Sequence, residues 1–147
     1  MNQPSRTCFP VNPRCFRGGN YVNIATHMRV LLIDDDPLIL DSIAEVLSFD
    51  GHDVAVAGNG HAALQRFSAA LGTDAPFEAV VTDLGMPVLN GIQVANEVRA
   101  MSESVRIILL TGWGERAREE KEFPATVNHL LAKPVRIHEL RAALESG

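Results

Sequence analysis

Short apolar runs alternate with longer amphipathic segments along the chain from residue 28 onward. The runs have the continuous hydrophobic character that strands buried on both faces require. We predict five strands, over Val30–Ile33, Asp53–Ala57, Ala79–Asp83, Val105–Leu110 and Val127–Leu131. Apolar residues at helical spacing between and after these runs predict five helices, which begin at about Pro37, Ala62, Gly91, Glu115 and Arg136.

This alternation of strands and helices indicates the fold class. Short loops between the elements predict an α/β domain in which helices cover both faces of a parallel sheet. Because crossover connections are right-handed, we expect a doubly wound five-stranded parallel sheet with five flanking helices. The periodicity does not determine the order of the strands. The length of 147 residues is typical of a single domain.

Two of the predicted helices carry distinctive signals. Asp36 followed by Pro37 is typical of an N-cap and a first helical turn, and Gly51 marks the end of that helix. The segment Glu115–Glu122 is almost wholly charged and offers only Ala117 to a core. We therefore expect it to form a short and exposed helix.

The first 27 residues differ from the rest of the chain. They contain proline, glycine and asparagine without a sustained period, so we expect residues 1–27 to be a disordered extension and residues 28–147 to be the folded domain. An alternative is that Met28 is the natural start. Cys8 and Cys15 both lie in the extension, where we expect two inert thiols.

Charge and hydropathy exclude several classes of partner. The first 27 residues hold three of the 13 Lys and Arg residues and none of the 18 Asp and Glu residues, which leaves the folded domain acidic. An acidic domain is repelled by nucleic-acid phosphates. No apolar run approaches the roughly 20 residues that cross a bilayer, and no secretory signal precedes the domain. We expect a cytoplasmic protein without direct nucleic-acid or membrane binding.

Polar residues that could bind a ligand or take part in a reaction follow four of the five predicted strands. Asp34 and Asp35 follow the first strand, and Asp83 ends the third. Thr111 and Lys133 come after the fourth and fifth strands. The carboxyl ends of parallel strands lie at one edge of the sheet, where α/β folds bind ligands, so we expect these residues to converge.

Convergence of three carboxylates predicts a bound cation, because the like charges otherwise oppose ionisation. Oxygen ligands without histidine or cysteine favour Mg²⁺. A carboxylate beside Mg²⁺ can attack phosphorus, which makes Asp83 the candidate nucleophile and predicts an aspartyl phosphate. Lys133 and Thr111 are then the candidate groups that stabilise the phosphoryl oxygens.

Taken together, these motifs resemble the receiver domain of two-component response regulators. The resemblance runs from Met28 to about Glu145 and rests on Asp34-Asp35, on Asp-x-x-Met-Pro-x-x-Asn-Gly from Asp83 to Gly91, on Thr111 and on Lys133-Pro134. It implies a flavodoxin-like strand order of 2-1-3-4-5. It also implies phosphorylation of Asp83 by a phosphohistidine on a sensor histidine kinase or a histidine phosphotransfer protein. The implied Mg²⁺ ligands are Asp35, Asp83 and the Gly85 backbone carbonyl, with Asp34 acting mainly through water.

The sequence departs from the family pattern at three places. Gly112 stands where Ala usually follows the Thr, and the bulky Trp113 comes next. Leu130 occupies a switch position that is commonly Tyr or Phe. The charged segment Glu115–Glu122 lacks the usual apolar contacts, so we expect a more plastic output face.

Two functional classes remain in competition. The first is a stand-alone receiver, a signalling phosphoacceptor rather than an enzyme, which acts by binding an unknown output protein or passes phosphate on as a phosphorelay intermediate. The alternative is a Mg²⁺-dependent phosphatase with an Asp nucleophile, of the haloacid dehalogenase type. Such enzymes need a second acid two residues after the nucleophile, where this chain has Gly85. A degenerate receiver that binds partners without phosphate is disfavoured by the complete set of site residues.

Overall fold

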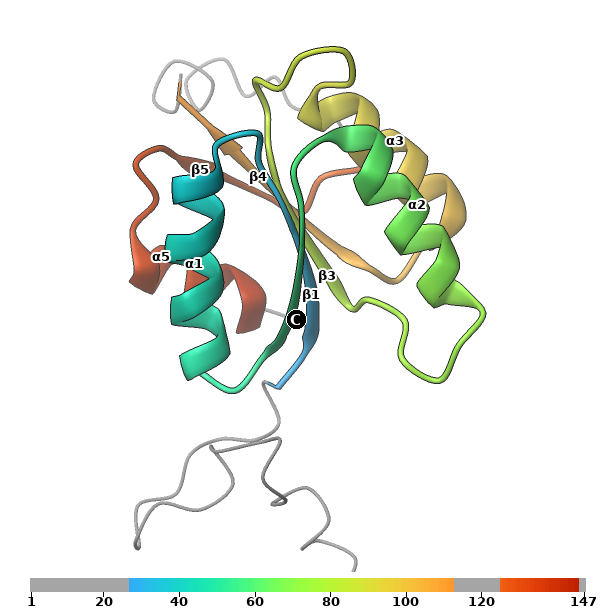
Figure 1. The fold of residues 1–147 in the computed structure, drawn as a ribbon, viewed down its shortest axis with the longest axis horizontal. Helices are drawn as coiled ribbons and strands as arrows, with labels where there is room; N and C mark the ends of the chain where they lie inside the picture. The colour runs from blue at the N-terminus through green and yellow to red at the C-terminus, as the bar shows by residue number, and fades with distance from the viewer. Residues whose placement is uncertain (1–26, 113–124, 146–147) are drawn as a thin grey trace, which may run out of the picture.

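A computed structural model describes residues 27–112 and 125–145 of the chain. Five parallel strands form one sheet in the order β2-β1-β3-β4-β5 (Figure 1). Their bounds are Arg29–Ile33 for β1, Asp53–Ala57 for β2, Ala79–Asp83 for β3, Arg106–Thr111 for β4 and His129–Ala132 for β5. Both the doubly wound sheet and the strand order implied by the family resemblance are therefore confirmed.

Four helices lie within the described residues, where we had predicted five for the whole chain. They are α1 over Pro37–Phe49, α2 over Gly60–Leu71, α3 over Gly91–Met101 and α5 over Ile137–Glu145. The predicted helix at Glu115–Glu122 and residues 1–26 of the predicted extension 1–27 lie outside the described residues. None of the described helices has the length and apolar character needed to cross a bilayer.

The three inner strands β1, β3 and β4 are buried on both faces, which explains their long apolar runs. Leu31 and Ile33 pack with α2 and α3 on one face, whereas Val30 and Leu32 pack with α1 and α5 on the other (Figure 1). All five residues of β3, at the centre of the sheet, are buried. The end of β3, which carries Asp83, is therefore held between the neighbouring strands β1 and β4.

The helix start next to the predicted site is confirmed in detail. The Asp36 side chain accepts a hydrogen bond from Leu38 N at 3.0 Å, and Pro37 is the first residue of α1. Helix α3 begins with a capping box in which Asn90 and Gln93 each accept from the other's backbone N–H at 2.9 Å. These caps position the starts of the two helices that follow the acidic strand ends.

The predicted bounds of the last two strands were wrong by one or two residues. Strand β5 begins at His129 rather than Val127, because the Asn128 side-chain oxygen accepts from Ile107 N at 2.7 Å where a strand would offer a backbone carbonyl. Val127 is buried without belonging to the strand. Strand β4 extends to Thr111, which pairs with Ala132 of β5.

Candidate functional site

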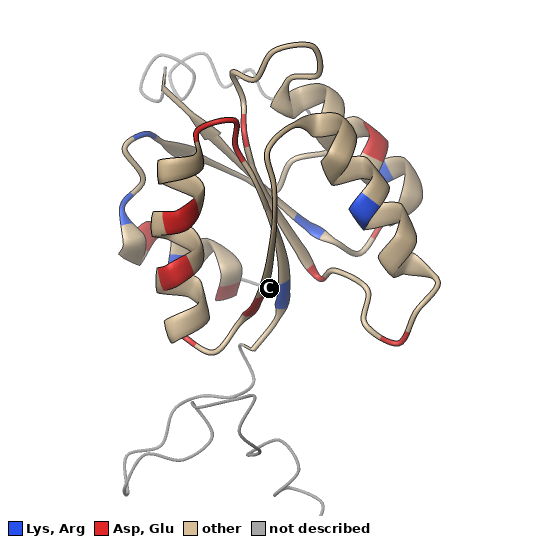
Figure 2. Cartoon of the chain, viewed as in Figure 1, with Lys and Arg blue, Asp and Glu red and all other residues tan. Residues whose placement is uncertain are grey.

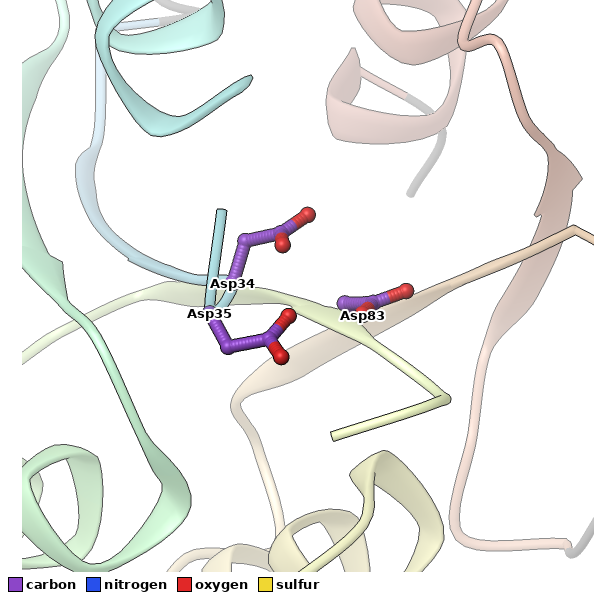
Figure 3. Close-up of side chains that lie close together, drawn as sticks. All are labelled: Asp34, Asp35 and Asp83. Atoms are coloured by element: carbon purple, nitrogen blue, oxygen red, sulfur yellow. The ribbon is translucent and has the colours of Figure 1, made fainter. Parts of the chain in front are cut away.

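Three carboxylates meet at the carboxyl edge of the sheet, as the sequence predicted. Asp34 and Asp35 leave the end of β1, and Asp83 ends the neighbouring strand β3 (Figure 3). Each offers an oxygen atom within 4.8 Å of the others. Asp34 and Asp83 are buried, with 1% and 6% of their surface exposed, whereas Asp35 is exposed. Figure 2 shows these acidic strand ends side by side at one end of the molecule.

Lys133 supplies the positive charge at this edge. Its Nζ atom lies 3.0 Å from Asp83 Oδ1 and 3.3 Å from Asp34 Oδ2, and its backbone N–H donates to the Thr111 carbonyl at 2.9 Å. Burial opposes the ammonium charge, but the hydrogen bond to Asp83 and the nearby charges of Asp34 and Asp83 outweigh it. The pKa of Lys133 therefore lies above its ordinary value of 10.5, so the side chain is cationic at neutral pH.

A cavity of about 650 Å³ adjoins the carboxylate of Asp83. It is lined by Asp83, Leu84, Gly85, Asn90, Ile92, Thr111, Gly112 and Lys133. Thr111 is 1% exposed and reaches this cavity from the end of β4, as predicted. Gly85 also lines the cavity, and the role of its backbone carbonyl as a metal ligand stays a prediction.

One contact at the site was not expected from the sequence. The backbone N–H of Asp36 donates to Asp34 Oδ1 at 2.9 Å and so orients the Asp34 carboxylate toward Lys133. The signal was present, because a carboxylate two residues before a helix-capping residue commonly accepts such a turn hydrogen bond. Asp36 therefore serves the site through its backbone while its side chain caps α1.

The electrostatics of Asp34 reflect its crowded position. Burial raises the pKa of Asp34, and the charge of Asp83 raises it further. The Asp36 hydrogen bond and Lys133 lower it, but the net pKa lies above the ordinary 3.8. In the metal-free protein the free energy of unfolding therefore decreases as the pH rises from about 3.8, where Asp34 ionises in the unfolded chain, through the raised pKa, where it ionises in the folded protein.

This cost predicts that Asp34→Asn stabilises the metal-free protein at neutral pH. Asparagine keeps the acceptor for Asp36 N–H and removes the ionisation penalty. Its amide NH₂ then faces Lys133, whose ammonium stays paired with Asp83. We expect Tm to rise by a few degrees at pH 7, with the difference shrinking as the pH falls toward 3.8. Thermal unfolding across pH in a chelator checks this, with the exposed Asp41→Asn on α1 as control. A lower Tm for Asp34→Asn at pH 7 would contradict the assigned penalty.

The structure describes two of the positions at which the sequence departs from the family pattern, Leu130 and Gly112. Leu130 is partly buried and packs against the apolar core beneath α2 and α3. Gly112 lines the cavity, and a Cβ atom there would meet none of the described residues within 4 Å. Trp113 and the segment Glu115–Glu122 lie outside the described residues, so the predictions made for them stay predictions.

Comparison with known proteins gives a consistent family match. The model of the response regulator receiver domain family matches residues 30–145. Response regulator MprA of Mycolicibacterium vanbaalenii is 31% identical over 119 residues, which cover 81% of this chain and 49% of MprA. The uncharacterized transcriptional regulatory protein YesN of Bacillus subtilis is 30% identical over 80% of this chain and 31% of its own length. The chain thus spans half or less of the length of these relatives.

Solved structures agree with the family match. A response regulator receiver domain protein from Clostridium thermocellum superimposes with a TM-score of 0.71 at 28% identity, covering 80% of this chain and 90% of that one. The response regulator TrrA from Thermotoga maritima, solved in complex with Mg²⁺-BeF, gives a TM-score of 0.67 at 27% identity. That alignment covers 80% of this chain and 96% of TrrA.

Proposed function

Because this chain belongs to the response regulator receiver domain family, we propose that it accepts a phosphoryl group on Asp83 and thereby switches its binding to a protein partner. Receiver domains are the signalling phosphoacceptors of two-component systems, and the family interacts with histidine kinases and output effectors. The observation that carries the proposal is the 3.0 Å ion pair of Lys133 with Asp83, beside a cavity that Thr111 also lines.

The proposed reaction transfers a phosphoryl group from a phosphohistidine to Asp83. One carboxylate oxygen of Asp83 attacks phosphorus and forms an O–P bond, while the P–N bond breaks and its electron pair returns to the imidazole nitrogen. Lys133 then donates hydrogen bonds to the phosphoryl oxygens, and the Thr111 hydroxyl donates another. The chain thus acts by positioning and by charge compensation.

The donor set of the site fits Mg²⁺. Three carboxylates from two neighbouring strands converge within 4.8 Å, and hard divalent cations prefer oxygen ligands. We propose that Asp35, Asp83 and the Gly85 carbonyl hold the ion directly, with Asp34 acting through water. When bound, Mg²⁺ would supply positive charge that offsets the phosphoryl oxygens.

We further propose the classes of partner. The phosphoryl donor is a sensor histidine kinase or a histidine phosphotransfer protein, and the proposed place of transfer is the cytoplasm. The output partner is a protein rather than a nucleic acid, because the acidic domain repels phosphates. A terminal switch and a phosphorelay intermediate both fit this chemistry.

The rival phosphatase is not favoured. Its second acid would stand at position 85, which is glycine and has no side chain that could transfer a proton. The site therefore lacks a general acid at the position where the rival mechanism needs one.

The test of the proposed function uses acetyl phosphate as a small donor. We expect the full chain to gain the mass of one phosphoryl group in the presence of Mg²⁺, because the nucleophile and its charge partners belong to the chain. Chelation with EDTA should lower the labelling rate by about tenfold or more, and added Mg²⁺ should restore it. Intact-mass measurement over time checks both results. Absence of labelling, or labelling that EDTA leaves unchanged, would contradict the proposal.

A further inference from the structure

The outer face of α1 combines acidic and apolar side chains in one row. Leu38, Asp41, Glu45 and Phe49 follow one another at intervals of three and four residues, so they share one face of the helix. All four are exposed, Leu38 by 75% and Phe49 by 78%. We call these four residues the α1 stripe. Helix α1 contains no basic residue, so nothing on the helix itself neutralises the two acids (Figure 2).

The two acids of the α1 stripe have charge available for a partner. Within the described part of the chain, neither Asp41 nor Glu45 forms an ion pair. They are four residues apart on the helix, where like charges repel. Other acids near the start of β1 are already engaged, because Asp53 pairs with Arg29 at 3.3 Å and Glu78 accepts from Arg29 N at 2.9 Å. A basic segment near this end of the domain would therefore find its available acids on α1.

The chain enters the folded domain beside the end of α1. The His27 side chain donates from Nδ1 to the Gly51 carbonyl, and the Met28 N–H donates to His52 Nδ1 at 3.1 Å. Gly51 and His52 come directly after the capping residue of α1, whose last helical residue is Phe49. The 26 residues that precede His27 are therefore tethered next to one end of the α1 stripe.

The predicted extension has the composition that this stripe calls for. It contains three arginines and no acid, and residues 14–21 place Arg14 and Arg17 close to the aromatic residues Phe16 and Tyr21. Arginine pairs with carboxylates and packs on aromatic rings, and aromatic rings pack on one another. The segment therefore offers basic side chains for the acids of the stripe and an aromatic ring for its exposed apolar end.

The tether is long enough for this contact. Arg17 precedes His27 by ten residues, and a flexible chain of ten residues spans about 17 Å on average. The stripe from Phe49 to Asp41 covers roughly 12 Å of helix. Exposed ion pairs are weak, but a short tether gives an effective concentration on the order of millimolar, which favours even a weak contact.

We propose that residues 14–21 bind to the α1 stripe of the same chain. The order of the residues then places Tyr21 nearest Phe49, and Arg17 and Arg14 beside the two acids. The contact covers exposed apolar surface and makes the extension an intramolecular competitor of any protein that binds to α1. It needs no phosphoryl transfer, so the proposal does not rest on the proposed function.

The two cysteines of the chain provide the test, because both lie in the extension. In full-length Cys8→Ser, Cys15 is the only thiol and can carry a nitroxide spin label. We expect the label to reduce the amide NMR signals of Asp41–Phe49 to less than half of their intensity with the reduced label. Signals of α2 and α3, on the other face of the sheet, should keep most of their intensity. Salt at about 0.5 M should weaken the effect on α1, because it screens exposed charges.

A charge exchange tests the assigned partners. Asp41→Lys combined with Glu45→Lys should restore the α1 signals to near the intensity with the reduced label. Both positions are exposed, so Tm should change by less than about 2 °C. Adding Arg14→Glu and Arg17→Glu to these substitutions reverses the charges on both sides and should bring the broadening of α1 back.

The matched control carries the same change in net charge away from α1. Glu97→Lys with Glu103→Lys alters two exposed acids, of which Glu97 lies on α3 and Glu103 follows it, and the broadening of α1 should be unchanged. Equal broadening on all faces would overturn the proposal, as would broadening of α1 that persists in the lysine variants. Isotope-labelled protein without the spin label, mixed with unlabelled spin-labelled protein, should show intact α1 signals. Broadening in this mixture would assign the stripe to a second copy and overturn the contact within one chain.

Discussion

Asp83→Asn is expected to abolish phosphorylation by acetyl phosphate, with labelling below detection in intact-mass measurement. The amide has the size of the carboxylate but lacks the charged oxygen that attacks phosphorus. We expect neither neighbouring acid to replace it, because Asp34 has one oxygen 3.3 Å from Lys133 and the other bonded to Asp36 N–H, and Asp35 is the proposed metal ligand. The label on the wild type should also be released by hydroxylamine, which cleaves acyl phosphates.

This loss should be chemical rather than structural. Lys133 keeps its contact with Asp34 in the variant, and neutralising one of three clustered acids relieves repulsion, so Tm without metal should not fall. Asp53→Asn is the matched control. Asp53 pairs with Arg29 at 3.3 Å at the opposite end of the strands, and this variant should be labelled normally. Labelling of Asp83→Asn at the wild-type rate would place the acceptor elsewhere.

The sequence predicted the site well because the site follows from strand ends. A parallel sheet brings all carboxyl ends to one edge, so Asp34, Asp83 and Lys133 could be placed together although 99 residues separate the first from the last. The cap at Asp36 was equally predictable, because N-capping is a local interaction. The strand order came from the family resemblance, since periodicity carries no information about neighbours.

What could not be predicted depends on tertiary contacts of single residues. Arg99 reads as a surface cation at the end of α3, yet it donates to the carbonyls of Val105 at 2.7 Å and of Thr126 at 2.9 Å. The sequence gives Asn128 no sign of a role in the sheet, but its side-chain oxygen accepts a hydrogen bond from Ile107 N, which a backbone carbonyl would accept in a regular strand pair. Val88 has a left-handed backbone conformation, with φ of 68°. Residue propensities could not predict it, because valine is among the residues that adopt this conformation least readily.

Gly91 is a glycine because the backbone around Asp83 leaves no room for a side chain. It is the first residue of α3 and follows the Asn90 cap, in a segment that runs directly over the end of β3. A Cβ atom at this position would lie 2.4 Å from the Asp83 carbonyl oxygen and 2.9 Å from Leu84 Cα. It would also lie 2.7 Å from Leu109 Cδ1, a buried side chain of β4. Two of the three clashes are with backbone, which cannot move by rotating a side chain.

Gly91→Ala is therefore expected to destabilise the fold and to misplace Asp83. The intrinsic helix preference of alanine favours the variant by about 1 kcal/mol, but overpacking against fixed backbone costs about 3 kcal/mol or more, so the clash prevails. We expect Tm to fall by roughly 5–10 °C and labelling by acetyl phosphate to slow in the molecules that stay folded. Gly58→Ala is the matched control, because a Cβ there meets nothing within 4 Å. If Gly91→Ala matched that control in Tm and labelling, α3 would have to move away from β3 at little cost, and the close approach would not be what positions Asp83.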